Sequence, residues 1–125
     1  MAEKRTVPAD LRRLVLERAG ACCEYCFSQE EYSVQAFSVE HIVPRIVGGL
    51  TTAENLAYSC QGCNAHKAVK TAAVDAVTET MVMLYDPRQQ IWGEHFWNAD
   101  CTEIIGLTAV GRATIEALHL NRDGS

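Results

Sequence analysis

Two Cys-x-x-Cys pairs constrain the fold of this chain more than any other feature of its sequence. The first pair is Cys23 with Cys26, the second is Cys60 with Cys63, and thirty-three residues lie between them. Four thiolates at this spacing are typical of a closed tetrahedral zinc site, in which the ion ties two distant segments together. A thiol redox protein needs only one such pair, preferably at a helix start in a thioredoxin-like pattern, and that pattern is absent. We therefore expect a structural Zn²⁺ site.

The chain has two further cysteines, Cys22 and Cys101. Cys22 is next to Cys23 and competes with it as a ligand, but the geometry of a Cys-x-x-Cys knuckle favours Cys23. We interpret Cys22 as a small core residue. Cys101 stands alone in an acidic region, and we interpret it as a structural or merely tolerated residue.

The composition fits one ordinary domain over residues 1–125. Hydrophobic residues make up 48% of the 125 residues and charged residues 22%, which allows a modest core. Residues 1–8 form no apolar leader, and no run of eighteen apolar residues follows, so we expect no membrane span. We expect a cytoplasmic protein, because a reducing compartment favours metal binding over disulfides for paired cysteines.

The charge of the chain is unevenly distributed. The net charge of −5 argues against a protein that coats nucleic acid by bulk electrostatics. Residues 1–74 hold eight acidic and eight basic side chains, whereas residues 75–125 hold eight acidic and three basic ones. We expect any nucleic-acid contact in the first part.

The segment Val39–Lys67 carries the groups that a hydrolytic site needs. It places Glu40 beside His41, then a Gly-Gly loop, then Asn55, and then the second cysteine pair followed by Asn64 and Lys67. Cutting a phosphodiester requires a base that deprotonates water, a hard cation that stabilises charge on phosphate, and a rigid frame. His41, Glu40 with Asn64, and the cysteines can supply these three in turn. The order of groups indicates metal-dependent phosphodiester hydrolysis.

Local signals predict the elements around this segment. Pro8 and Asp10 suit the start of a helix, and apolar residues follow helical spacing up to Gly20, which predicts a helix over Ala9–Ala19. A β-rich stretch ends at Pro44, and a second strand candidate is Leu56–Tyr58. We expect a two-stranded hairpin with Glu40 and His41 near its exposed rim. The predicted elements that flank it are a loop over Arg45–Thr52 and a short helix from Cys63 to about Lys70.

The C-terminal extension, residues 75–125, gives weaker signals. The periodicity of Val74–Val82 does not decide between helix and strand. We predict a turn at Asp86–Arg88, a strand over Trp92–Asn98 that packs a hydrogen-bonded His95, and a short apolar run at Ile104–Leu107. A final helix, about Ala109–His119, has Thr108 as its candidate N-cap.

Residues 23–70 resemble the HNH endonuclease family. The resemblance is carried by the run from Glu40 to Arg45, the Gly-Gly pair, Asn55, and the Cys-x-x-Cys-Asn-x-x-Lys run. It implies an α+β fold with a ββα-metal core stapled by a four-cysteine zinc site, an N-terminal helix and a C-terminal extension of strand and helix. It also implies that the protein grips the DNA backbone and cuts it with one divalent cation.

The same resemblance implies roles for individual residues. His41, Asn55 and Asn64 take the places of the three letters of the family name, Glu40 that of the metal-binding acid, and Lys67 that of the usual lysine. Asparagine at the last place is a variant that the family tolerates. On a helix Asn64 and Lys67 share a face, whereas Asn64 and His66 point to nearly opposite sides. We therefore expect Asn64 as the ligand and keep His66 as a second possibility.

The resulting hypothesis is hydrolysis of DNA. His41, neutral at pH 7 with an ordinary pKa, takes a proton from water, and Mg²⁺ or Mn²⁺ suits the oxygen ligands. We interpret Asn55 as a strut that holds the His41 strand. Arg45, Lys67 and His66 are candidate phosphate contacts, although each could be an ordinary surface residue.

Alternatives stay open at this point. A zinc-stapled module of the same fold could bind nucleic acid or protein without cutting, but such a binder would need neither the acid nor the base of the motif. A protein partner or a homodimer is compatible with the sequence. We favour the enzyme because Glu40, His41, Asn55 and Asn64 are all present.

Overall fold

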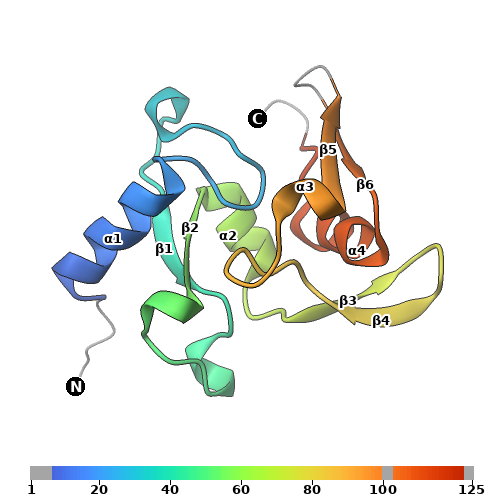
Figure 1. Ribbon diagram of the computed structural model, residues 1–125, viewed down its shortest axis with the longest axis horizontal. Helices are drawn as coiled ribbons and strands as arrows, with labels where there is room; N and C mark the ends of the chain where they lie inside the picture. The colour runs from blue at the N-terminus through green and yellow to red at the C-terminus, as the bar shows by residue number, and fades with distance from the viewer. Residues whose placement is uncertain (1–6, 100–102, 123–125) are drawn as a thin grey trace.

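The computed structural model describes residues 7–99 and 103–122, and Cys101 lies outside them (Figure 1). The fold is mixed α+β, as predicted, and the described strands pair as three separate antiparallel hairpins. In chain order the elements are α1 (Ala9–Ala19), η1 (Glu30–Tyr32), β1 (Ser38–His41), η2 (Arg45–Val47), η3 (Ala53–Asn55), β2 (Leu56–Ser59), α2 (Gln61–Lys67), β3 (Ala72–Asp75), β4 (Thr80–Met83), α3 (Trp92–His95), β5 (Phe96–Ala99), β6 (Glu103–Gly106) and α4 (Ala109–Leu118).

Helix α1 has the predicted bounds. Gly20 ends it in a left-handed conformation with φ +64°, and its N–H donates to the Glu17 carbonyl. Glycine adopts this conformation without strain, which is why it is common directly after helices. Val15 is fully buried, and Arg18 donates to the Leu56 carbonyl at 2.5 Å, so α1 packs against β2.

The hairpin of β1 and β2 is also confirmed, with Glu40 opposite Ala57 and His41 opposite Leu56. Successive side chains on a strand point to opposite faces, so Glu40 and His41 face different surroundings. The predicted exposed position is wrong for Glu40, which is only 7% exposed because its side chain points into the fold, whereas His41 is half-buried.

Helix α2 begins two residues earlier than predicted and ends at Lys67 rather than near Lys70. Cys60 serves as its N-cap, because the Cys60 Sγ accepts a hydrogen bond from the Cys63 N–H at 3.4 Å. The second knuckle is therefore also the start of this helix.

The structure corrects one element of the extension. The predicted strand over Trp92–Asn98 is wrong in its first half, where Trp92–His95 form the single turn α3 and only Phe96 begins β5. The Trp92 indole N–H donates to the Tyr25 carbonyl at 2.9 Å and its ring stacks on Phe96 at 5.1 Å. These tertiary contacts override the strand propensity of the aromatic residues.

The remaining extension follows the predictions more closely. The ambiguous segment Val74–Val82 belongs to the hairpin of β3 and β4, and the apolar run at Ile104 lies in β6. Helix α4 has Thr108 as its N-cap, whose hydroxyl accepts from the Gly111 N–H at 3.1 Å. His119 lies just after the helix end, and His95 is hydrogen-bonded through Nδ1 to Thr108 at 2.7 Å.

One core joins the extension to the first part of the chain (Figure 1). Tyr25, Leu56, Phe96 and Leu118 are almost completely buried in it. Within the described ranges, no helix has the length and apolar character needed to span a membrane.

Candidate active site and metal centre

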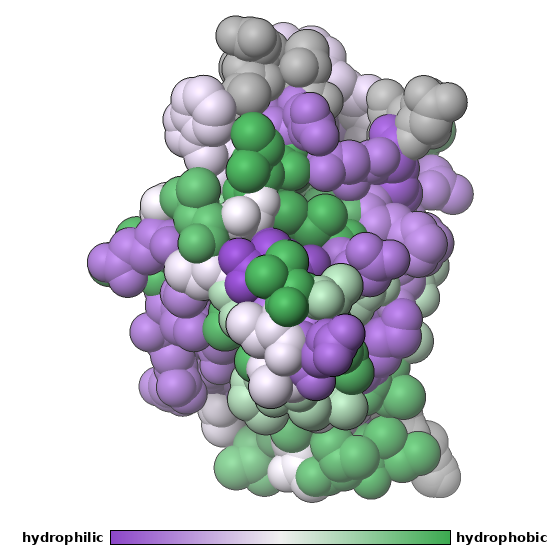
Figure 2. Space-filling view, turned by 90° about the vertical axis from the view of Figure 1, so that its right-hand side faces the viewer, coloured by the Kyte–Doolittle hydropathy of each residue, from purple (hydrophilic) through white to green (hydrophobic). Residues whose placement is uncertain are grey.

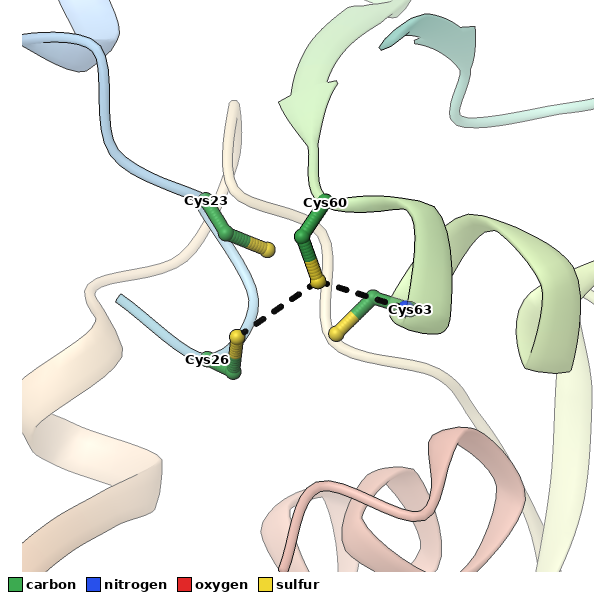
Figure 3. A group of neighbouring side chains, drawn as sticks. All are labelled: Cys23, Cys26, Cys60 and Cys63. Carbon is green, nitrogen blue, oxygen red and sulfur yellow. Dashed lines mark hydrogen bonds between the residues drawn. The ribbon is translucent and has the colours of Figure 1, made fainter. Parts of the chain in front are cut away.

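The four predicted zinc ligands converge in space (Figure 3). Their sulfur atoms all lie within 4.8 Å of one another, and the Sγ atoms of Cys26 and Cys60 are 3.8 Å apart. A tetrahedral zinc ion with Zn–S bonds of about 2.3 Å requires sulfur atoms roughly 3.8 Å apart. In the part of the chain that the structure describes, this is the only group of three or more Cys, His, Asp or Glu side chains placed to hold a metal ion. The donor set fits a structural Zn²⁺.

Hydrogen bonds among the four cysteines divide them into two kinds of thiol. The hydrogen bond with Cys23 lowers the pKa of Cys26 to about 6 and also lowers the pKa of Cys60. The pKa values of Cys23 and Cys63 are raised, chiefly by the hydrogen bonds with Cys26 and Cys23 respectively. Arg122 donates from Nη2 to the Sγ atoms of Cys60 and Cys63 at 3.5 and 3.6 Å. Cys22 lies outside the cluster, and its backbone pairs with that of Gln29 in an isolated antiparallel β-bridge.

His41 is held at the end of β1 by a threonine. Its Nε2 lies 2.8 Å from the Thr51 hydroxyl oxygen, to which Arg45 also donates at 3.4 Å. Partial desolvation, with a smaller contribution from the Arg45 charge, lowers the pKa of His41. Both effects disfavour the imidazolium, so the ring is neutral at pH 7.

Asn55 spans the base of the loop between β1 and β2. Its Oδ1 accepts from the Val43 N–H at 2.9 Å, and its Nδ2 donates to the carbonyls of Val43 and Leu50 at 3.1 and 2.8 Å. The Asn55 backbone carbonyl also accepts from the Ile42 N–H at 2.9 Å. Asn55 therefore joins Val43 to Leu50 through its side chain and binds the residue that follows His41 through its backbone.

Glu40 points away from His41, toward α2 and the first cysteine knuckle. Its carboxylate accepts from the Tyr25 hydroxyl, and Lys67 Nζ lies 3.4 Å from its Oε1. Burial raises the pKa of Glu40, while the Lys67 charge and the hydrogen bond from Tyr25 act in the opposite direction.

The predicted role of Lys67 as a phosphate contact does not match this geometry. The side chain is 2% exposed, and its Nζ donates to the Ile42 carbonyl at 2.8 Å. An ammonium group placed in this way neutralises a buried carboxylate instead of facing solvent. Lys67 thus holds Glu40 and the chain just after His41.

The two other candidates on α2 lie in different surroundings. Asn64 is half-buried, and its side chain makes no hydrogen bond within residues 7–99 and 103–122. It lies three residues before Lys67 on α2, a spacing that brings two helical side chains near the same face. His66 stacks on His119 with ring centroids 4.2 Å apart, so it lies where α2 meets the end of α4. Desolvation, followed by the charge of His119, lowers the pKa of His66.

A comparison with protein families matches the segment of the chain that carries these residues. Residues 23–70 match the HNH endonuclease family. The matched segment is 48 of the 125 residues. It contains both cysteine knuckles, the β1–β2 hairpin and α2, and its family points to nuclease chemistry and nucleic-acid binding as the class of function. Among curated proteins, no sequence matches the chain.

Three residues that contact the HNH site were missed from the sequence. Tyr25 lies between the cysteines of the first knuckle, and no local sequence pattern predicts its contact with Glu40. Thr51 could have been predicted from the sequence, because a hydroxyl group in the loop after His41 is an obvious hydrogen-bond partner for an imidazole. Arg122 is fifty-nine residues from Cys63 in sequence, so no spacing rule could pair them.

Proposed function

We propose that this protein is a divalent-cation-dependent endonuclease that hydrolyses DNA phosphodiester bonds, with His41 as the general base. The observation that carries the proposal is the setting of His41, a neutral imidazole oriented by Thr51 beside an exposed arginine. A general base must be unprotonated at the working pH and fixed in direction.

Thr51 links His41 to Arg45 through its hydroxyl group. The Arg45 guanidinium can only donate, so it uses one lone pair of the Thr51 oxygen. The hydroxyl can then accept the Nε2–H of His41 with its other lone pair, or donate its own proton to an unprotonated Nε2. We propose the first arrangement, in which Nδ1, which has no hydrogen-bond partner among the described residues, takes the proton from the attacking water.

Asn64 and Glu40 support a cation site. The unpartnered Asn64 amide on α2 and the Glu40 carboxylate on β1 are the oxygen donors that we assign to the cation, because hard cations such as Mg²⁺ or Mn²⁺ prefer oxygen. The cation would neutralise charge on the phosphate and stabilise the leaving oxygen. Lys67 favours the ionised form of Glu40, which burial alone would disfavour.

Arg45 completes the proposed site on the solvent side. It is exposed, lies next to the base, and carries a guanidinium that can pair with phosphate oxygens. Because it also contacts Thr51, a phosphate bound by Arg45 would lie close to His41.

The test is cleavage of supercoiled plasmid at low salt by the zinc-loaded protein with Mg²⁺ or Mn²⁺. We expect nicked or linear products that chelation of the added cation abolishes. His41→Ala, purified in parallel, should keep its zinc content and melting temperature and lose cleavage. Equal cleavage by this variant would remove His41 from the mechanism. DNA binding without cleavage by either protein would favour the non-catalytic module.

A further inference from the structure

The loop between β1 and β2 exposes three large aliphatic side chains beside His41. Ile46 is 80% exposed, Val47 60% and Leu50 68%. Figure 1 places this loop at the lower end of the molecule, and hydrophobic side chains gather at that end in Figure 2. Single exposed aliphatic residues are ordinary, but a cluster of them on a short segment marks an interaction surface. We call residues 45–50 the aliphatic loop.

Backbone hydrogen bonds and two glycines define the path of the aliphatic loop. The N–H groups of Val47 and Gly49 both donate to the Pro44 carbonyl, at 3.1 and 2.9 Å. Gly48 has φ +99°, and a Cβ on Gly49 would lie 1.7 Å from the Val43 carbonyl oxygen, so both glycines are needed for this path. A loop held in this way presents its side chains without losing much conformational entropy on binding.

The position and charge of the loop indicate what it contacts. Arg45 begins the loop, Thr51 follows it, and both are joined to the His41 ring through the Thr51 hydroxyl. A phosphodiester within reach of His41 therefore has its neighbouring nucleotides over the aliphatic loop. The sequence from His41 to Ala53 holds no acidic residue, so Arg45 gives this surface a positive charge that suits DNA.

We propose that the aliphatic loop is a wedge that packs against bases next to the cut phosphate, and that the preferred substrate is DNA with a locally opened base stack. This inference rests on the proposed function. Aliphatic side chains cannot read bases by hydrogen bonding, so they recognise exposed base faces instead of sequence. Inserting them into a paired duplex requires unstacking, whereas a mismatch or a bulge already presents open bases.

The test compares two oligonucleotide duplexes that differ only by a central two-nucleotide bulge. Affinity is measured by fluorescence anisotropy in the His41→Ala background without added divalent cation, so that binding is separated from cleavage. We expect the bulged duplex to bind on the order of tenfold more tightly than the paired one. Replacing Ile46, Val47 and Leu50 together by serine should abolish this preference, with a loss of roughly tenfold or more on the bulged duplex.

A matched control replaces aliphatic residues that are equally exposed elsewhere. Val77 and Ile91, 70% and 64% exposed, are changed to serine together and should leave both affinities unchanged. Equal binding of the two duplexes by the parent protein, or an unchanged preference in the loop variant, would overturn the proposal. A dimer that the loop variant dissociates would assign the loop to a second copy of the chain instead. Plasmid cleavage by the His41 protein is scored separately, so failure of the nuclease proposal can be told from failure of the wedge.

Discussion

Removal of the Asn55 side chain offers the most direct test of how the HNH loop is held. Asn55→Ala deletes three hydrogen bonds, one accepted from Val43 and two donated to the carbonyls of Val43 and Leu50. A hydrogen bond of this kind contributes about 0.5–1.5 kcal/mol net, and water can reach the half-buried site. We therefore expect a loss of about 2–3 kcal/mol in the free energy of unfolding. In a domain of this size the melting temperature should fall by roughly 8–12 °C.

A second substitution separates the acceptor from the donors. Asn55→Asp keeps the oxygen that accepts from the Val43 N–H but replaces both donated bonds by an oxygen facing two carbonyls. Because like partial charges then face one another, this variant should be at least as unstable as the alanine variant. Asn98, exposed on β5, provides the control, and Asn98→Ala should change stability by less than about 0.5 kcal/mol.

The assay is urea unfolding with zinc present, followed by plasmid cleavage at a temperature where each variant is folded. A loosened loop no longer fixes Thr51 against His41. The kcat of folded Asn55→Ala should therefore fall at least tenfold, and its KM should change by a smaller factor. A stability loss below about 0.5 kcal/mol together with unchanged kcat would refute the strut reasoning.

Three further predictions concern zinc and pH. Stripping zinc with a strong chelator should unfold the protein cooperatively, as followed by circular dichroism, and an unchanged melting temperature would exclude a structural role for the ion. The pKa of His41 is lowered, so the midpoint of the acid limb of the pH–rate profile should lie below the ordinary histidine value of 6.5. Arg45→Gln should move this midpoint upward, and an unchanged midpoint would show that the Arg45 charge does not lower the pKa of His41. The two hydrogen bonds from Arg112 hold the pKa of Asp75 below its ordinary value of 3.8. Ionised Asp75 therefore stabilises the fold above that value, and its contribution is lost as the pH falls through the lowered pKa. In acid titrations Arg112→Gln should unfold at higher pH than the parent protein, and superimposable titrations would contradict this.

The features that the sequence predicts well are those fixed by neighbours along the chain. Pro8 and Gly20 bracket α1, so its bounds follow from helix start and stop signals alone. The cysteine pairs are also predictable, because each Cys-x-x-Cys knuckle is formed by neighbouring residues. Only the contact between the two knuckles joins residues that are distant in sequence. Thr108 is a third example, since an N-cap needs only the residues directly after it.

The sequence does not show which of these side chains are buried in the fold. Alternation along β1 predicts that Glu40 and His41 face opposite sides, but it does not say which side is the interior. The burial of Lys67 depends on α2 packing over β1, so a lysine that reads as a phosphate contact becomes a partner of Glu40. At Trp92 a partner sixty-seven residues away, the Tyr25 carbonyl, replaces the predicted strand by a helical turn.

These distant contacts also give the C-terminal extension a role. Arg88 pairs with Glu24 and donates to the Leu56 carbonyl at 3.2 Å, and Trp92 donates to the Tyr25 carbonyl. All three contacts reach the first knuckle or the start of β2. Tyr25 in turn donates to Glu40, so the extension supports the carboxylate from behind. Residues 23–70 taken alone would leave Glu24 without its arginine, so we expect any minimal stably folded fragment to include residues after position 75.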